Sequence, residues 1–272
     1  MDCYGVIGYP IKHSVSPAMH NAAFKHLGMD AIYLSFEVKP EDLRDAVFGA
    51  KALGIIGLNV TIPHKEAILN YVKPVGIAAQ IGAVNTVLVE KLEGYNTDAY
   101  GAIKTLESSG VDVDGKTVLI VGAGGAARAI AFALAERKST VIISNRTESR
   151  GLKLAEDVRK VGECIFYPHE KLEDLKGKID IIINATPLGM KGFPQKLPVP
   201  ESLIHNVVVF DTVYNPMETP LIALARKRDC KIVYGIDMLV YQGAEAFRIW
   251  TGVEPPVDVM KKAALEVLRR IP

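Results

Sequence analysis

An amine and a carboxylate within the first hundred residues are the main candidates for proton transfer. Lys65 follows an expected strand and lies at the start of an expected helix, where a positive charge opposes the helix dipole, so a structural role does not favour it. Asp98 follows Asn96 and Thr97, and taken alone it is equally well explained as an acidic residue in the first turn of a helix. Oxidation of an alcohol to a ketone needs an acceptor for the hydroxyl proton, and both side chains suit that task. The alternatives are His13, His20 and His64.

Hydroxyl and amide groups accompany this pair. Ser14 and Ser16 lie between an expected strand and an expected helix that begins at Pro17. Ser16 alone is explained as the N-cap of that helix, whereas two hydroxyls two residues apart also suit a clamp for a small carboxylate. Further polar groups follow at 59–65 and 82–86. Together they suit a polyhydroxylated carboxylic acid whose alcohol is oxidised beside a nicotinamide.

A glycine-rich loop joins an apolar run, 118–121, to an apolar helix. Gly122 permits a tight turn, Gly124 lets a pyrophosphate approach the backbone, and the small Ala127 lets helix and strand pack closely. The free N–H groups at the start of the helix then receive phosphates. A tight strand–helix turn without a ligand is the alternative. The loop residues expected at the cofactor are Gly122, Ala123, Gly124, Gly125 and Ala126.

The residues after the second strand favour NADP over NAD. An NAD site usually places Asp or Glu there to hold the ribose 2′-hydroxyl, whereas this chain has Asn145, Arg146 and Thr147. Arg146 and Arg150 are four residues apart at a helix start, so both can face one phosphate, which arginine binds in bidentate fashion. A solvated basic turn is the alternative.

Short runs rich in Val and Ile alternate with helix-like segments, a pattern that predicts α/β architecture with right-handed crossovers. At about 150 residues per domain, the 272 residues predict two domains, with a junction in or just before 98–109. Two runs around Glu90-Lys91, at 86–95, indicate a β-hairpin. Beyond Tyr234 only helices are expected, at 238–250 and 257–271, and they must pack back on one of the two sheets. Strands are expected at 4–8, 32–38, 57–61, 117–121, 140–145, 164–167, 179–184, 207–211 and 231–234, and helices at 17–27, 41–53, 64–71, 98–109, 126–137, 148–161 and 219–227.

Composition excludes several classes of protein. Hydrophobic residues make up 49% and charged residues 23%, which is typical of globular chains and excludes a disordered one. Lys and Arg number 32 against 31 Asp and Glu, so nothing in the charge favours nucleic acid. Cys3, Cys164 and Cys230 suit neither a disulfide scaffold nor a metal site. With neither a leader pattern nor an uncharged span of about 18 residues, we expect a cytoplasmic protein.

Motifs along almost the whole chain resemble those of the shikimate dehydrogenase family. In the first half these are GYPIKHSVSP at 8–17, NVTIPHK at 59–65, GAVNT at 82–86 and NTD at 96–98. In the second half they are GAGGAA at 122–127, NRT at 145–147, ATPLGM at 185–190, DTVYNP at 211–216 and QGA at 242–244. So many separate motifs in the family's order make a chance match very improbable.

The resemblance implies an NADP-dependent enzyme that reversibly reduces 3-dehydroshikimate to shikimate, in the biosynthesis of chorismate and the aromatic amino acids. It implies a substrate-binding domain, 1–101 and 238–272, and an NADP-binding domain of the doubly wound Rossmann type, 102–237. The C-terminal helices would return to the substrate domain. The implied partner is a small-molecule substrate, with neither nucleic acid nor membrane, and the chain would be a monomer or homodimer.

The resemblance also implies roles for individual residues. It makes Lys65 and Asp98 the catalytic pair, and Ser14 and Ser16 the carboxylate ligands. The ring hydroxyls of the substrate would be bound by Thr61, Asn85 and Gln242, with Asn59 and Tyr214 nearby. The adenosine 2′-phosphate would be bound by Asn145, Arg146, Thr147 and Arg150. The nicotinamide cleft would be lined by Thr186, Val213, Gly235 and Met238.

Three other functions stay open at this point. A quinate/shikimate dehydrogenase that uses NAD would carry an acidic residue where Asn145 and Arg146 stand. A folate-type dehydrogenase of similar two-domain build is disfavoured by the serine pair, and a catalytically silent NADP-binding sensor by the intact lysine and aspartate. The hairpin between Asn85 and Asp98 is shorter than the resemblance leads us to expect, which puts its shape and contacts in question.

Overall fold

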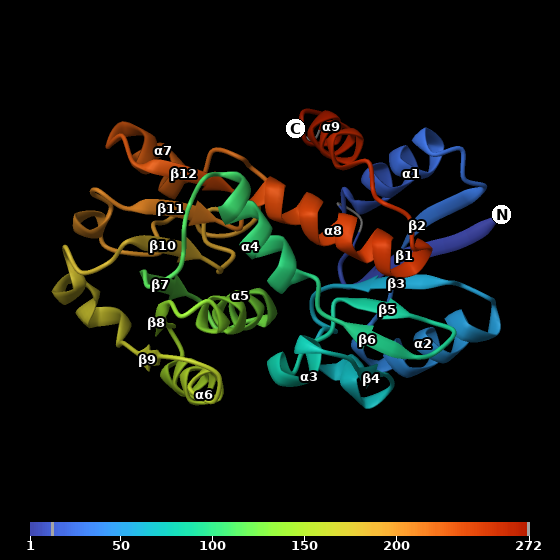
Figure 1. Ribbon diagram of the computed structural model, residues 1–272, viewed down its shortest axis with the longest axis horizontal. Helices are drawn as coiled ribbons and strands as arrows, with labels where there is room; N and C mark the ends of the chain where they lie inside the picture. The colour runs from blue at the N-terminus through green and yellow to red at the C-terminus, as the bar shows by residue number, and fades with distance from the viewer. Residues whose placement is uncertain (12–13, 271–272) are drawn as a thin grey trace. The chain divides into compact units, whose positions relative to one another are not determined.

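The computed structural model describes residues 1–11 and 14–270, which form two compact units (Figure 1). The first unit comprises Met1–Gly101 and the C-terminal segment that starts at Leu239, and the second comprises Ala102–Met238. Two helices, α4 (Asp98–Ser108) and α8 (Gly235–Thr251), contribute residues to both units.

The first unit contains a mixed six-stranded sheet in the order β2-β1-β3-β5-β6-β4. Strands β2 and β3 both run parallel to β1, whereas β5 is antiparallel to β3 and β6. The hairpin expected at 86–95 is therefore present as β5 and β6. The strands are β1 Asp2–Gly8, β2 Ala31–Glu37, β3 Gly57–Val60, β4 Lys73–Pro74, β5 Thr86–Leu88 and β6 Glu93–Tyr95.

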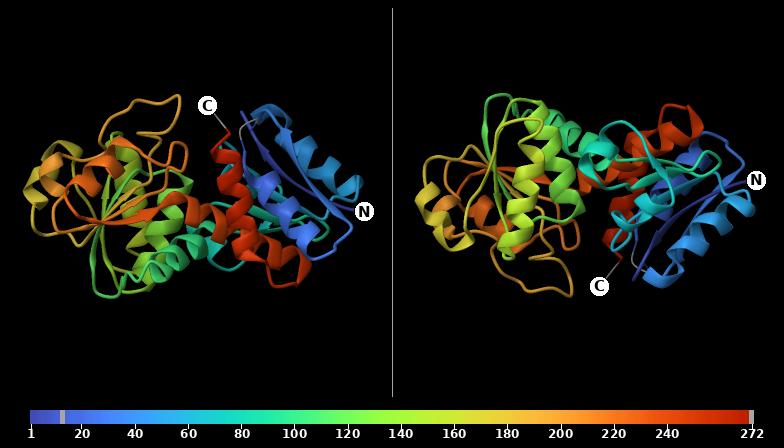
Figure 2. Two further views of the ribbon diagram at one scale, coloured as in Figure 1. Left: turned by 90° about the horizontal axis from the view of Figure 1, so that it is seen from above. Right: turned by 90° about the horizontal axis from the view of Figure 1, so that it is seen from below.

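Helices cover this sheet because each has an apolar face. In α2 (Leu43–Ala52), Leu43, Val47 and Ala50 recur at helical spacing, and all three are buried. The C-terminal helix α9 (Val257–Leu268) packs against α1 (Ser16–His26), as the views in Figure 2 also show. The expectation that the C-terminal helices return to the N-terminal sheet is confirmed. The short elements are α3 (Ile77–Ile81), η1 (Pro40–Asp42) and η2 (Ala67–Asn70).

The prediction of a helix at 64–71 is wrong. The structure has only η2, a four-residue 3₁₀ helix, because the chain turns away after Tyr71 to form β4. Lys73 there donates its N–H to the Leu92 carbonyl oxygen at 2.7 Å. Lys65 lies in a turn that precedes η2, so the helix-dipole argument that singled it out does not apply to this backbone.

The second unit contains a parallel six-stranded sheet in the order β12-β11-β10-β7-β8-β9, the doubly wound arrangement expected for this half. Its four central strands, β11, β10, β7 and β8, are nearly all apolar and buried, as required when helices cover both faces. Helices α5 and α6 pack beside β7, β8 and β9, and α7 packs beside β11 and β12. The elements are β7 Thr117–Val121, α5 Gly125–Glu136, β8 Thr140–Ser144, α6 Glu148–Val158, β9 Cys164–Phe166, η3 His169–Leu175, β10 Ile181–Asn184, η4 Glu201–Leu203, β11 Val208–Asp211, α7 Pro220–Lys227 and β12 Lys231–Tyr234.

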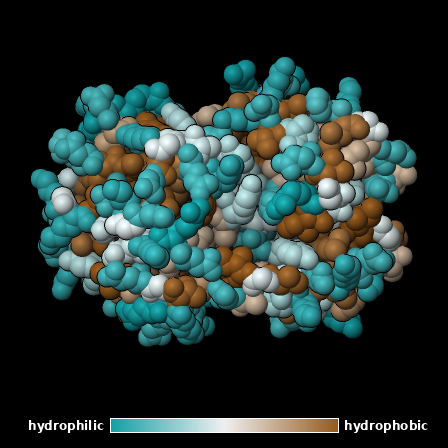
Figure 3. All heavy atoms as spheres, viewed as in Figure 1, coloured by the Kyte–Doolittle hydropathy of each residue, from teal (hydrophilic) through white to brown (hydrophobic). Residues whose placement is uncertain are grey.

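The surface is mixed in polarity. Hydrophilic residues dominate the rim of the face shown in Figure 3, and hydrophobic residues lie between them in small groups. Within residues 1–11 and 14–270, no helix combines the length and apolar character needed to cross a bilayer.

Candidate active site

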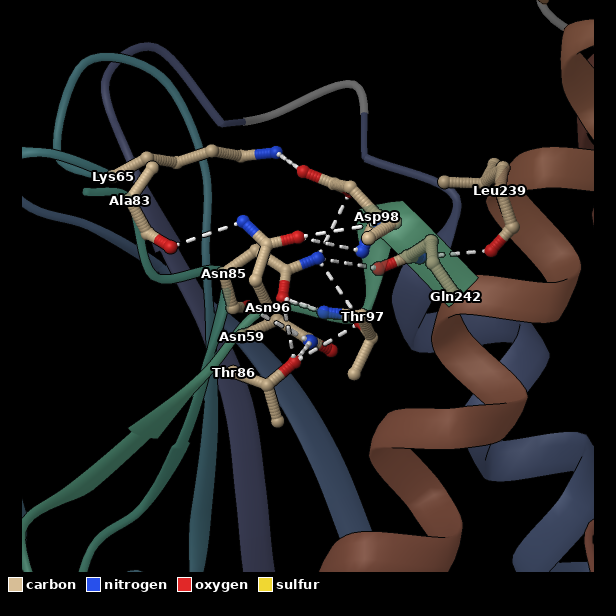
Figure 4. Close-up of polar contacts among 11 residues, drawn as sticks. Asn59, Lys65, Ala83, Asn85, Thr86, Asn96, Thr97, Asp98, Leu239 and Gln242 are labelled. Atoms are coloured by element: carbon tan, nitrogen blue, oxygen red, sulfur yellow. Dashed lines mark hydrogen bonds and ion pairs between the residues drawn. The ribbon is translucent and has the colours of Figure 1, made fainter. Parts of the chain in front are cut away.

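Lys65 and Asp98 form an ion pair beyond the carboxyl ends of β3 and β6 in the first unit. The Lys65 Nζ lies 2.5 Å from the Asp98 Oδ2, although 33 residues separate them in the chain (Figure 4). Lys65 comes from the turn after β3, and Asp98 is the first residue of α4. Their side chains are 17% and 7% exposed, so the pair is largely shielded yet still reaches solvent.

Asn85 lies at the centre of the hydrogen bonds around this pair. Its Nδ2 donates to the Asp98 Oδ1 at 2.9 Å and lies 3.0 Å from the Thr97 Oγ1. Its Oδ1 accepts the Thr97 backbone N–H at 2.8 Å. The Gln242 Oε1, on α8, lies 3.4 Å from the same Asn85 nitrogen. Asn85 therefore orients the aspartate oxygen that does not face Lys65.

Asn96 fixes the start of α4, and with it the position of Asp98. Its Oδ1 accepts the backbone N–H groups of Asp98 at 3.1 Å and Ala99 at 3.3 Å, and its Nδ2 donates to the Ala83 carbonyl oxygen. Sequence reasoning placed Asn96 in a motif without assigning this role. Its place two residues before the first helical residue, in the region where Asn is favoured as a cap, was the available signal.

Asn59 has both ends of its carboxamide in use within the protein. Its Nδ2 donates to the Asn85 carbonyl oxygen at 3.2 Å and to the Thr86 Oγ1 at 3.1 Å, while its Oδ1 accepts the Tyr33 hydroxyl at 2.7 Å. Asn59, Asn85 and Thr86 are all buried. Sequence reasoning did not find Tyr33, because a tyrosine in a strand carries no signal beyond strand preference.

Ser14 and Ser16 lie where β1 connects to α1, but Ser16 is not the N-cap of that helix. Val15 occupies the cap position with helical angles, and no side chain caps the helix there. Ser14 Oγ instead accepts the Ser16 backbone N–H at 3.3 Å. The start of α1 therefore uses neither hydroxyl as a cap. His13 lies outside the described residues.

The side chains of the two remaining histidine candidates are both buried and directed at other partners than the ion pair. His64 is buried, and its Nε2 lies 2.7 Å from the Val38 carbonyl oxygen. His20 is fully buried beside Tyr33, Phe247 and Trp250, and neither ring nitrogen has a hydrogen-bond partner among the described residues. Burial lowers the pKa of His20 to about 3. Neither ring is arranged for proton exchange with a ligand.

The other expected substrate residues are distributed over both units. Thr61 directly follows β3, four residues before Lys65, and Gln242 donates its Nε2 to the Leu239 carbonyl oxygen on α8. Tyr214 belongs to the second unit, where it follows β11, so it is not part of the cluster described above.

The glycine loop of the second unit has the backbone geometry of a phosphate site. Gly122 has φ +123°, and a Cβ there would meet the Ala185 carbonyl oxygen at 2.7 Å, so only glycine fits. Gly124 is the N-cap of α5, and a Cβ on it would meet nothing within 4 Å. The open space lies at the start of a 12-residue helix whose first N–H groups are free for an anion. The other loop residues are Ala123, Gly125 and Ala126.

Arginine and amide groups gather after β8. Asn145 donates its Nδ2 to the Thr147 carbonyl oxygen at 2.8 Å, and Thr147 is the N-cap residue of α6. Arg146 and Arg150 are exposed, and in the described part of the chain neither is ion-paired to a carboxylate within 4 Å. Two unpaired guanidinium groups beside a helix start fit a phosphate monoester better than a ribose hydroxyl.

Residues expected at the nicotinamide follow the carboxyl ends of three neighbouring strands. Thr186 follows β10, Val213 follows β11, and Gly235 and Met238 begin α8 after β12. A Cβ on Gly235 would meet the Thr212 carbonyl oxygen at 2.4 Å. Strands β7 and β10 are adjacent while the connections leave them in opposite directions, and ligands bind at such a switch point.

A buried aspartate that sequence reasoning missed shapes these strand ends. Asp211 accepts hydrogen bonds from the Asn184 Nδ2 at 2.9 Å, the Thr219 Oγ1 at 2.6 Å and the Val213 N–H at 3.0 Å. Burial raises its pKa, against the effect of these donors. The network fixes the backbone directly before Val213.

Three family models match successive parts of the chain. The shikimate dehydrogenase substrate-binding domain matches residues 6–87, shikimate/quinate 5-dehydrogenase matches 104–189, and the shikimate 5′-dehydrogenase C-terminal domain matches 235–265.

Individual relatives match over nearly the full length. The shikimate dehydrogenase (NADP(+)) of Archaeoglobus fulgidus is 62% identical over 266 residues, which cover 97% of this chain and 98% of that protein. A crystal structure of shikimate dehydrogenase in complex with NADP+ superposes with a TM-score of 0.93 at 46% identity, covering 98% of this chain and 96% of that one. The Thermus thermophilus shikimate 5-dehydrogenase in complex with NADP(H) and shikimate gives 0.89 at 36% identity, covering 98% and 100%.

Proposed function

Since the chain belongs to the NADP-dependent shikimate dehydrogenase family, we propose that it interconverts shikimate and 3-dehydroshikimate at the polar cluster of its first unit. The observation that carries the proposal is the Lys65–Asp98 ion pair, held at the edge of the sheet by Asn85 and Asn96. A largely buried ammonium group beside a carboxylate can donate a proton to an alcohol or ketone oxygen and accept it back.

Lys65 and Asp98 divide the proton chemistry between them. In ketone reduction the Lys65 ammonium hydrogen-bonds the carbonyl oxygen of 3-dehydroshikimate and stabilises the negative charge that develops there. Asp98 keeps the ammonium in place through the 2.5 Å contact, and its other oxygen is held by Asn85. The proton that completes the reduction is delivered through this hydrogen-bonded pair.

The remaining polar side chains of the first unit bind the substrate. Ser14 and Ser16 donate their hydroxyls to the substrate carboxylate. Thr61, Asn85 and Gln242 bind the ring hydroxyls. Tyr214 is proposed as a further substrate residue, contributed by the second unit. The carboxylate clamp fixes which end of the ring faces Lys65.

The second unit is the proposed NADP-binding domain. When bound, NADP(H) supplies or accepts the hydride at the substrate carbon. The glycine loop receives the pyrophosphate at the start of α5, and Asn145, Arg146, Thr147 and Arg150 bind the 2′-phosphate. Thr186, Val213, Gly235 and Met238 line the nicotinamide position. The open space beside Gly124 and the two unpaired arginines support this assignment.

The three cysteines are free, which supports the proposal that the enzyme works in the reducing cytoplasm.

One assay tests the function directly. Shikimate or quinate is offered with NADP+ or NAD+, and the absorbance of the reduced nicotinamide is followed. We expect the highest kcat/KM with shikimate and NADP+. Absence of turnover with that pair contradicts the proposal, and preference for quinate and NAD+ replaces it with the quinate alternative.

A further inference from the structure

A buried tyrosine is hydrogen-bonded to one of the amides beside the proposed active site. We propose that Tyr33 is a positioning residue for the substrate: its hydroxyl sets the orientation of Asn59, and through it the geometry of Asn85. The inference rests on the proposed function, since it concerns how the same residues are held ready for shikimate.

Tyr33 is held in place from three directions. Its ring stacks on His20, with centroids 4.3 Å apart and planes 8° from parallel. Asn21 clamps its backbone, donating its Nδ2 to the Tyr33 carbonyl oxygen at 2.9 Å and accepting the Tyr33 N–H at 2.8 Å. The side chain is completely buried. A ring so constrained delivers its hydroxyl to one fixed point.

That fixed point decides the orientation of the Asn59 carboxamide. Tyr33 lies on β2 and Asn59 on β3, and the tyrosine hydroxyl reaches across β1 to donate to the Asn59 Oδ1 at 2.7 Å. An amide whose oxygen faces a donor must turn its Nδ2 the other way. That nitrogen is thereby directed at the Asn85 carbonyl oxygen and the Thr86 Oγ1.

The orientation matters because Asn85 touches the reacting groups. Asn85 donates to Asp98 and lies within reach of Gln242, while its own carbonyl oxygen accepts from Asn59. Asn59 has no amide hydrogen or oxygen left without a partner, so it acts through its neighbours rather than as a direct ligand. Removal of the Tyr33 hydroxyl leaves the buried Asn59 oxygen without a donor and frees the amide to turn.

The Tyr33 hydroxyl stays a donor because of its surroundings. Burial raises the pKa of the Tyr33 phenol well above its ordinary value, against the smaller effect of Ser16, and keeps the phenol protonated. The hydrogen that orients Asn59 is therefore always present on the Tyr33 oxygen.

The test is Tyr33→Phe, which removes one buried oxygen and keeps the stacked ring. We expect KM for shikimate to rise about tenfold, the range for a buried acceptor left without its donor, with KM for NADP+ within twofold of wild type. Neither KM depends on the folded fraction, so a loss of stability cannot imitate this split. A change of less than twofold in the KM for shikimate overturns the inference.

Tyr4→Phe is the matched control. Tyr4 is the direct partner of Tyr33 in the β1–β2 register, is buried, and packs on Phe24 and Trp250. Among the described residues, no hydrogen bond joins its hydroxyl to Ser16 or Asn59. The same deletion there should leave both KM values unchanged, and a rise in KM for shikimate equal to that of Tyr33→Phe overturns the inference.

A double-mutant cycle separates an action through Asn59 from a general effect. In the Asn59→Ala background, Tyr33→Phe should raise KM for shikimate by less than twofold, since the orienting contact is already gone. Full additivity of the two changes overturns the relay. If the wild-type chain does not turn over shikimate at all, the proposed function fails; if it does and Tyr33→Phe is silent, only this inference fails.

Discussion

The polar cluster of the first unit is made of side chains, whereas the glycine loop of the second unit offers mainly backbone. The first brings together Lys65 from the turn after β3, Asn85 from the residue before β5, and Gln242 from α8. The second depends on Gly122, where only glycine fits, and on Gly124, where the space is open. A backbone site is local in sequence and tolerates no added atoms, and a side-chain site depends on contacts between distant segments.

The two sites are therefore sensitive to different kinds of substitution. In the second unit, a methyl group added to the glycine loop is expected to block the binding of NADP(H) without removing any hydrogen bond. In the first unit, loss of one polar atom is expected to change the geometry of its neighbours, because nearly every amide there is fully used. Substitutions in the two units should therefore separate cleanly into effects on the cofactor and effects on the substrate or on turnover.

Of the substitutions considered, Lys65→Ala should have the largest effect on turnover. Lys65→Ala should lower kcat at least about a hundredfold with little change in KM for shikimate, since it removes the group that stabilises charge on the reacting oxygen. Steady-state kinetics measure it, and Lys51→Ala, an exposed lysine on α2, is the control. Near-normal turnover of the Lys65 variant would remove this lysine from the mechanism.

The next effect tests the backbone site. Gly124→Ala should raise KM for NADP+ roughly 50-fold, because the new methyl occupies space through which the pyrophosphate approaches the loop. The fold should survive, since φ is −88° and nothing lies within 4 Å of the added atom. Gly49→Ala, an equally open helical position in α2, should leave KM for NADP+ and activity unchanged. If Gly124→Ala binds NADP+ normally, the loop is a structural turn only.

A smaller effect concerns cofactor choice within the second unit. Arg146→Ala should weaken NADPH about tenfold more than NADH, because an exposed charged hydrogen bond to the 2′-phosphate lies at the low end of its usual range. Titration of both reduced cofactors by fluorescence measures the ratio. Equal losses for both cofactors would mean that Arg146 does not bind the 2′-phosphate.

The contrast between the units also explains how far the sequence leads. The glycine loop and the basic turn after β8 are predictable because each is formed by residues close together in the chain, and the doubly wound sheet because apolar strands alternate with helices along the sequence. The hairpin at 86–95 followed from its short apolar runs. Lys65 and Asp98 were identified by chemical type, and the 2.5 Å contact between them needed the fold.

What the sequence does not reveal are contacts made by ordinary residue types. Nothing in the strand around Tyr33 marks its hydroxyl as the partner of Asn59, and nothing local marks Asp211 as the acceptor of three hydrogen bonds. The helix expected at 64–71 failed for a related reason: the pairing of β4 with β6, which is non-local, overrides helical preference there. Ser16 lost its expected cap role because Val15 takes helical angles first.

The smallest effect concerns His20, which we exclude from the proton chemistry proposed for Lys65 and Asp98. Burial lowers the pKa of His20 from 6.5 to about 3, so between these values the unfolded chain binds a proton that the folded chain does not. Stability therefore falls as pH falls below about 6.5, and from pH 7 to pH 5.5 this one group lowers the free energy of unfolding by about 1 kcal/mol.

His20→Phe keeps a flat ring against Tyr33 and removes that contribution. Urea unfolding at the two pH values should show the variant losing about 1 kcal/mol less than wild type, whereas His26→Gln, at an exposed position on the same helix, should lose as much as wild type. An unchanged pH dependence in His20→Phe would mean that the ring is protonated inside the fold, and the exclusion of His20 from the chemistry would then have to be reconsidered.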